Sequence, residues 1–144
     1  MNDLLMVLLI IAPISLLFHE AGHTLAANIF TSSSVNLHLG IGPRVLTWKH
    51  SRGEVAVNAF YFAGGMTISS QPEKAYAKVA IAIAGPVVNL MIAALTLLYP
   101  FHPSITTWFL FFNLWLGITN LIPFKLLGKE SDGWTIVKAI IKKT

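Results

Sequence analysis

Three long apolar stretches divide the chain, and each approaches the length needed to cross a membrane. They cover about residues 4–30, 76–99 and 104–124. A transmembrane helix needs about 20 mainly apolar residues, so this pattern predicts three transmembrane helices, with a kink expected at Pro13 in the first. The expected fold class is a mainly α-helical membrane protein.

The segment between the first two apolar stretches has a different period. Residues 45–62, VLTWKHSRGEVAVNAFYF, form two β-branched and aromatic runs around a Ser-Arg-Gly turn, which predicts a small β-hairpin. A hairpin on the protein surface fits this pattern as well as one partly embedded in the membrane. The apolar character of the segment favours partial embedding, where protein or a water-filled cavity surrounds the backbone.

The C-terminal stretch GWTIVKAIIKK is amphipathic. Four apolar side chains share one helical face, namely Trp134, Val137, Ile140 and Ile141. Lys138 and Lys142 lie away from that face. The pattern predicts a C-terminal interfacial helix, although a partner-binding helix would show the same pattern.

Composition agrees with a membrane protein of one domain. Of the 144 residues, 55% are hydrophobic and 11% are charged, whereas a soluble domain carries about 25% charged residues. The length suits a single domain over residues 1–144, with no inserted PDZ or regulatory domain expected. The chain has no cysteine, which excludes disulfides and thiolate metal ligands. A formal charge of +4 does not indicate nucleic-acid binding, because lysines near a membrane account for it.

Basic residues are distributed unevenly around the apolar stretches. Segment 31–75 and the tail after residue 124 carry most of them, whereas the first residues and the link PFHP carry none. The positive-inside rule therefore predicts a multi-pass protein, expected in the cell membrane, with its N-terminus outside and its C-terminus cytoplasmic. Without a basic region or a cleavage site at the N-terminus, the first stretch is expected to be retained.

The sequence HEAGH places ionisable side chains inside the first apolar stretch. On a helix, His19 and His23 are one turn apart on the same face. Two such imidazoles can bind one zinc ion, and Glu20 can act as general base toward water. This is the H-E-x-x-H pattern of metalloproteases. The alternative is a pair of buried histidines bonded to backbone carbonyls, which is disfavoured because such residues are rare in membrane helices without a function.

A catalytic zinc ion takes a third protein ligand and leaves one position open for water. At 1.5 Å per residue, the two histidines lie about 22 and 28 Å into the membrane, near the cytoplasmic side. Glu130 and Asp132 follow the third stretch on that same side. Asp132 is equally explained as a ligand or, like Ser131, as the N-cap of the next helix. The remaining histidines are poor candidates because they lie in the hairpin region or on the opposite side: His38, His50 and His102.

Four sequence pieces together resemble the site-2 proteases, a family of intramembrane zinc metalloproteases. They are HEAGH in the first stretch, GIGP with GG in the intervening region, AGPVVN in the second stretch, and NLIP followed by DG after the third. Their order is that of the family, and they cover most of the chain. The resemblance implies a minimal catalytic core of that family.

The resemblance also implies roles for individual residues. It implies that His19, His23 and Asp132 bind one zinc ion per chain and that Glu20 is the catalytic base. The substrate-binding positions that it implies are Asn89, Asn120, Pro123, Gly64 and Gly65. Asn89 would bind or orient the substrate carbonyl, whereas Asn120 and Pro123 would shape the substrate entry. A hydrogen bond to a neighbouring helix is the alternative for either asparagine.

One part of the sequence departs from the family. The segment FKLLGKES separates Pro123 from Asp132, whereas the family has a shorter linker with a leucine before Asp-Gly. Because of this longer linker, Glu130 is a rival of Asp132 for the position of third ligand. Asp132 is favoured because Gly133 matches the motif.

The function expected from these features is that of a zinc-dependent metalloendopeptidase. It would hydrolyse peptide bonds within or near transmembrane segments of membrane proteins or peptides, with its active site opening toward the cytoplasm. An edge strand within residues 55–66 is expected to pair with the unwound substrate. The alternative is a non-proteolytic membrane adaptor or metal-handling protein, which the complete H-E-x-x-H pattern disfavours. An oligomer and a regulatory membrane partner are both left open.

Overall fold

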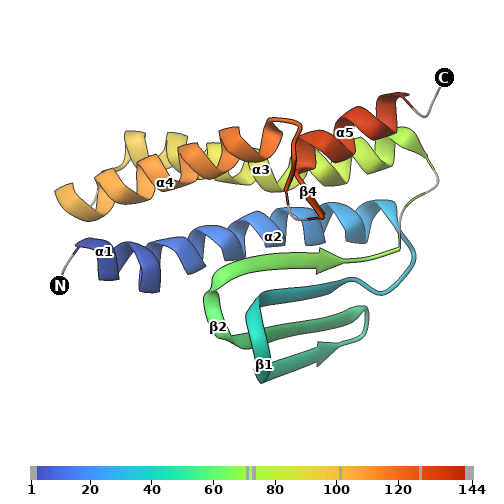
Figure 1. Ribbon diagram of the computed structural model, residues 1–144, viewed down its shortest axis with the longest axis horizontal. Helices are drawn as coiled ribbons and strands as arrows, with labels where there is room; N and C mark the ends of the chain where they lie inside the picture. The colour runs from blue at the N-terminus through green and yellow to red at the C-terminus, as the bar shows by residue number, and fades with distance from the viewer. Residues whose placement is uncertain (1–2, 71, 73, 101, 127, 142–144) are drawn as a thin grey trace.

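The elements alternate between apolar helices and one long hairpin. The computed structural model describes residues 3–70, 72, 74–100, 102–126 and 128–141 (Figure 1). Its elements, in chain order, are α1 (Asp3–Met6), the π-helical turn η1 (Val7–Ile11), α2 (Ala12–Phe30), β1 (Asn36–His50), β2 (Gly53–Ile68), α3 (Ala75–Leu98), α4 (Pro103–Leu121), β3 (Lys125–Leu126), β4 (Lys129–Glu130) and α5 (Asp132–Ile141). Glu73, Lys142 and Lys143 lie outside the described residues.

The first three helical elements form one uninterrupted helix, Asp3–Phe30, which adapts to the proline expected to kink it. Pro13 has no N–H, so the carbonyl of Leu9 loses its usual helical partner. The backbone widens into the π-helical turn η1 just before Pro13, which is a common response to such an interruption. The hydroxyl of Tyr61 in β2 lies 3.5 Å from the Leu9 carbonyl oxygen and donates to it.

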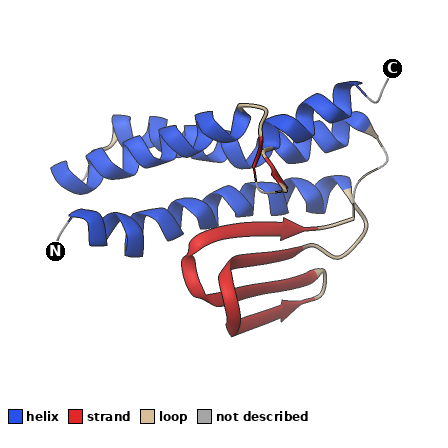
Figure 2. Cartoon of the chain, in the orientation of Figure 1, coloured by secondary structure: helices blue, strands red, loops and turns tan. Residues whose placement is uncertain are grey.

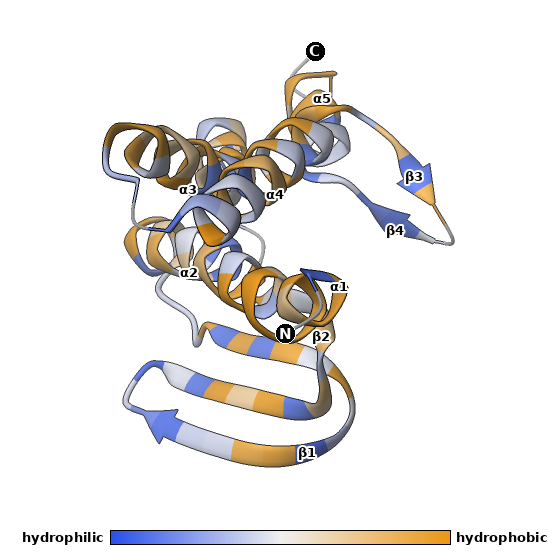
Figure 3. Cartoon of the chain, turned by 90° about the vertical axis from the view of Figure 1, so that its left-hand side faces the viewer, coloured by the Kyte–Doolittle hydropathy of each residue, from blue (hydrophilic) through white to orange (hydrophobic). Residues whose placement is uncertain are grey.

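Two of the three expected spans are confirmed as helices long and apolar enough to cross a membrane: Asp3–Phe30 and Ala75–Leu98. The third stretch forms the 19-residue helix α4, but its passage through a membrane stays a prediction. The C-terminal amphipathic stretch is helical in α5, and its interfacial position is likewise a prediction. Hydrophobic residues occur along all the long helices (Figure 3), and many large apolar side chains on them are exposed, which is the pattern of helices surrounded by lipid.

The predicted hairpin is confirmed, with its turn at Ser51 and Arg52 between β1 and β2. It is folded back on itself. Residues 36–39 pair antiparallel with 65–68. Residues 37–39 also pair, in the parallel direction, with 55–57, and 46–48 pair antiparallel with 55–57 on the other side. Gly40 and Gly42 adopt φ angles of +77° and +91° where β1 bends, a conformation that glycine reaches without steric cost. The segment 65–68 is consequently an edge of this sheet.

Helix α2 lies between two layers, with the sheet on one side and α3, α4 and α5 on the other (Figures 1 and 2). The contact between α2 and α3 is very close, because a Cβ atom at Gly22 would lie 2.7 Å from the carbonyl oxygen of Ala84. Small residues allow such close approach between membrane helices. Residues of α2 therefore reach both the sheet edge and the start of α5.

Candidate metal centre and active site

His19 and His23 face the same space from successive turns of α2, as their spacing predicts. Their Nε2 atoms are 3.2 Å apart, and their rings meet edge to face with centroids 4.7 Å apart. Both side chains are buried. The two Nε2 atoms thus converge on one point rather than on separate partners.

The outer nitrogens of both rings are bonded to α3. His23 Nδ1 lies 2.7 Å from the carbonyl oxygen of Ile81, and His19 Nδ1 lies 2.6 Å from Asn89 Oδ1. A carbonyl oxygen can only accept, so Nδ1 of His23 carries a proton, and in the neutral ring the lone pair is on Nε2. Such an outer hydrogen bond is characteristic of histidines that bind a metal.

Asp132 begins α5 and brings its carboxylate to the same point. Its Oδ2 lies 3.3 Å from His19 Nε2, and its Oδ1 lies 3.4 Å from His23 Nε2. Burial raises the pKa of the Asp132 carboxyl, but the adjacent His19 and His23 rings outweigh burial and hold that pKa below its usual range. The carboxylate is therefore ionised at neutral pH.

The linker before Asp132 is long, but its extra residues turn back on themselves. β3 and β4 form a two-stranded hairpin with Lys125 opposite Glu130, and Gly128 in its turn has a φ of +80°. The hairpin closes where the Ser131 N–H donates to the carbonyl of Phe124 over 3.0 Å. The extra residues of the linker form this hairpin, so its two ends lie close together and Asp132 still reaches the histidines.

Ser131 is the cap of α5, which leaves the carboxylate of Asp132 unused by the helix end. Its Oγ accepts from the N–H of Trp134 at 3.1 Å and from the N–H of Phe124 at 3.0 Å, and donates to the Ile122 carbonyl at 2.8 Å. Serine is a preferred N-cap because its oxygen bonds an unpaired N–H of the first turn. The same hydroxyl also fastens α5 to the segment after α4.

Glu130, the rival ligand, is directed elsewhere. Its carboxylate lies 2.6 Å from Lys138 Nζ and 3.8 Å from Lys125 Nζ. The hydrogen bond from Lys138 is the main reason that the pKa of Glu130 is lowered. Glu130 is thus engaged in surface ion pairs, while Asp132 lies with the histidines.

The three side chains fit a zinc ion. Their ligand atoms all lie within 4.8 Å of one another, and the closest pairs are separated by 3.2–3.4 Å. Tetrahedral ligands with bonds of about 2.0–2.1 Å are separated by roughly 3.3 Å. Two imidazole nitrogens and a carboxylate oxygen directed at one space are a ligand set that zinc accepts.

Glu20 is buried beside the sheet edge. The Thr67 hydroxyl lies 2.8 Å from Glu20 Oε2 and 3.0 Å from the Glu20 carbonyl oxygen. A Cβ atom at Gly65 would lie only 2.6 Å from Glu20 Cγ. Strand β2 and the predicted base are therefore in direct contact, and only glycine at position 65 permits that packing.

The predicted substrate-binding residues have varied surroundings. Asn89 bonds to His19 as described, Asn120 Nδ2 donates to the Leu116 carbonyl of its own helix at 3.0 Å, and Pro123 is exposed after α4. Gly64 has a φ of +131° with open space where a Cβ atom would be. Their roles toward a substrate stay predictions.

Sequence analysis missed several residues that shape this centre. A Cβ atom at Gly85 would collide with His23 Nε2, and one at Gly133 would collide with the carbonyl oxygen of Leu121. Both glycines lie within the quoted pieces AGPVVN and DG, so the motif was visible although its packing reason was not. Thr67, Asn113 and Ser15 carried no signal of their own.

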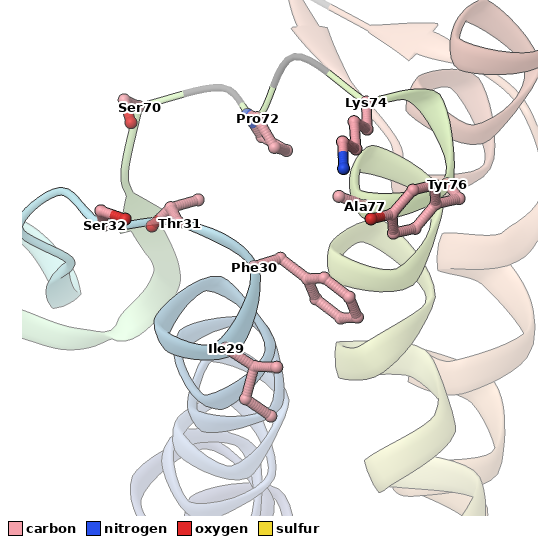
Figure 4. Close-up of a pocket in the computed structure, with 9 residues that line it drawn as sticks. All are labelled: Ile29, Phe30, Thr31, Ser32, Ser70, Pro72, Lys74, Tyr76 and Ala77. Atoms are coloured by element: carbon pink, nitrogen blue, oxygen red, sulfur yellow. The ribbon is translucent and has the colours of Figure 1, made fainter.

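A separate cavity of about 520 Å³ lies where α2 ends and α3 begins (Figure 4). Lys74 is a basic residue of its lining, and the Lys74 Nζ lies 5.7 Å from the centre of the Tyr76 ring. The cavity shares no lining residue with the His19, His23 and Asp132 group. It is therefore not the space between those ligands.

We expect the variant Ser131→Ala to bind zinc about tenfold more weakly and to lose about 1–2 kcal/mol of stability. It removes an N-cap and leaves buried backbone groups unpaired, which loosens Asp132. Zinc titration and thermal unfolding measure both effects. Thr135→Val is the control, because it removes a hydroxyl from α5 without removing the cap. Equal zinc affinity in Ser131→Ala and the wild type would contradict this role.

Comparison with known proteins agrees with the geometry. Residues 6–104 match the family model described as Peptidase family M50. The matched region contains HEAGH, the hairpin and AGPVVN, and ends before Asp132. A comparison with curated proteins finds no match.

Proposed function

The chain belongs to peptidase family M50, the site-2 protease family, and from this premise we propose that it is an intramembrane zinc metalloprotease. It would hydrolyse peptide bonds within or near transmembrane segments of membrane proteins or peptides. The observation that carries the proposal is the convergence of His19, His23 and Asp132, which come from opposite ends of the chain. A chain without a metal function has no need to bring these groups together inside apolar helices.

His19, His23 and Asp132 are the residues that would hold the zinc ion, one per chain. When bound, zinc provides Lewis acidity that lowers the pKa of water and polarises a carbonyl. Glu20 would take the proton from the attacking water and return it to the amine that leaves. Thr67 bonds to Oε2 of Glu20, so Oε1 would carry the proton.

The substrate must expose its amide bonds before Glu20 can act, because a transmembrane helix bonds them internally. The edge segment 65–68 contacts Glu20 through Gly65 and Thr67. An extended substrate would pair with this edge by strand addition, which supplies main-chain hydrogen bonds without sequence specificity. The partners proposed are thus unwound transmembrane segments in a lipid bilayer.

We expect the variant Met66→Pro to reduce substrate cleavage at least tenfold, because proline removes a backbone N–H and disturbs the edge strand. Met66→Ala, which removes only an exposed side chain, is its control. Ala63→Pro is the second variant, because the N–H groups of residues 63 and 66 point to opposite sides of β2. One of the two prolines therefore removes an N–H on the side away from β1. Cleavage is measured by co-expression with single-span substrates, and normal cleavage by both proline variants would refute strand addition.

The proposed orientation follows from the charges. α4 would be the third span of a multi-pass protein in the cell membrane, with the N-terminus outside. The active site would open to the cytoplasm, where the basic segments lie. Accessibility of single cysteines, introduced into this cysteine-free chain, to an impermeant reagent would test each position.

Metal removal tests the proposed function itself. Purified protein should contain one zinc ion per chain, lose cleavage completely with a chelator, and regain it when zinc is restored. Metal that exchanges freely, without any cleavage, would favour the alternative of a metal-handling protein. Protein that binds no zinc would refute the proposed function.

A further inference from the structure

A line of buried polar side chains leads from His19 across three helices. Asn89 in α3, Asn113 in α4 and Ser15 in α2 are each 0% exposed. Asn89 Nδ2 donates to Asn113 Oδ1 at 2.8 Å, and Asn113 Nδ2 donates to Ser15 Oγ at 2.9 Å. Polar side chains so deep among apolar helices are costly unless each is bonded. Here each of the three side chains is bonded to another member of the line.

The orientation of the Asn89 amide can be assigned from its contact with a backbone group. One end of that amide lies 3.1 Å from the carbonyl oxygen of Ser15. A carbonyl can only accept, so this end must be the NH₂ group, and the opposite end, Oδ1, must face His19. His19 Nδ1, 2.6 Å away, therefore carries a proton, and in the neutral ring the lone pair is on Nε2.

The orientation of Asn113 is determined in the same way. Its Nδ2 lies 2.8 Å from the carbonyl oxygen of Phe109, which again can only accept. Asn113 must then present Oδ1 to Asn89, and this acceptor holds the Asn89 amide in the orientation that His19 needs. If Asn113 were reversed, two NH₂ groups would face each other.

We propose that Asn113 is a positioning residue, which acts through Asn89 to fix the tautomer and ring orientation of His19. This inference rests on the proposed function, because it concerns the same metal-binding imidazole. Asn113 does not touch the group of His19, His23 and Asp132. Outer partners of metal-binding histidines change metal affinity when removed, and here the effect passes through one further amide.

The test uses the full-length protein in detergent or lipid, with the variant Asn113→Leu. In the metal-free wild type, at a pH where the ring is neutral, ¹⁵N NMR of the imidazole should show His19 protonated mainly on Nδ1, although Asp132 Oδ2 lies 3.3 Å from Nε2. In Asn113→Leu we expect a mixture of tautomers and a zinc affinity lowered about tenfold, the smaller end of effects seen for outer partners. Asn113→Ala serves the same purpose if the leucine variant fails to fold.

The control is Thr96→Val, which also removes a buried polar group from a membrane helix. Thr96 donates to the Ile92 carbonyl of its own helix at 2.8 Å and has no bond to the line. Its tautomer spectrum and zinc affinity should remain those of the wild type within about twofold. A general loss of packing would instead affect both variants.

The outcomes are distinct. If Asn113→Leu binds zinc as the wild type does, or weakens zinc binding without changing the tautomer, the inference is overturned. If the wild type itself binds no zinc, the proposed function fails. The tautomer of metal-free His19 then still decides whether Asn113 positions the ring.

Discussion

We expect the variant Glu20→Gln to lose substrate cleavage by about 10²–10⁴-fold, the usual contribution of a general base, while it still binds one zinc ion. Glutamine has the shape of glutamate, and its amide oxygen can accept a hydrogen bond from the Thr67 hydroxyl as Glu20 does. It cannot take up a proton from water. Co-expression with candidate single-span substrates measures cleavage, and metal analysis of the purified variant measures zinc.

The matched control is Glu54→Gln, the same change in the sheet. Glu54 pairs with Arg44 at 2.9 Å and lies 3.4 Å from His38, and it does not belong to the group of His19, His23 and Asp132. Its substitution should leave cleavage close to that of the wild type. Unchanged processing of substrates by Glu20→Gln would remove the protease function, whatever metal the protein binds.

The second large effect is expected at Gly85. A methyl group there would collide with Nε2 of His23 and would lie 2.7 Å from Cε1 of the same ring. The ring must move, and its Nδ1 bond to the Ile81 carbonyl and its distance to Asp132 must change with it. Because misplacement by about 1 Å can cost about 10²-fold in rate, Gly85→Ala should lose nearly all cleavage.

Zinc titration and substrate cleavage measure the effect of Gly85→Ala, and zinc affinity should fall along with cleavage. Gly117→Ala provides the control in α4, because the three nearest atoms that its methyl group would meet belong to the Leu90 side chain, at 2.9 Å, and the Pro86 carbonyl, at 3.1 Å, and not to His23. Both changes raise helix propensity equally. Normal zinc binding by Gly85→Ala would show that His23 is not confined by α3 as the packing indicates.

Features of this protein that depend on neighbouring residues were predicted from the sequence, whereas features that depend on distant residues were not. The H-E-x-x-H spacing predicted that His19 and His23 share a face, because helical periodicity is set within one turn. The hairpin turn at Ser51 and Arg52 was predicted for the same reason, since turn residues act locally. The sequence did not predict that 36–39 pair with 65–68 or that 37–39 also pair with 55–57, because strand register depends on distant partners.

The choice between Asp132 and Glu130 illustrates the limit of sequence reasoning. Both are carboxylates near the start of one helix, and each could have been a cap, a surface residue or a ligand. Ser131 caps the helix and Glu130 forms an ion pair with Lys138. Asp132 is the carboxylate that lies beside the histidines. These are contacts between side chains whose positions depend on the β3–β4 hairpin and on the packing of α5.

By itself the sequence determined the apolar helices, the hairpin turn and the histidine pair of α2, because hydrophobic periodicity and turn preference are properties of neighbouring residues. Only the tertiary structure decided which carboxylate joins that pair, which glycines make room for it and which buried amides orient it. Those outcomes depend on how closely α2, α3, α4 and α5 pack, and packing brings together residues that no local pattern relates.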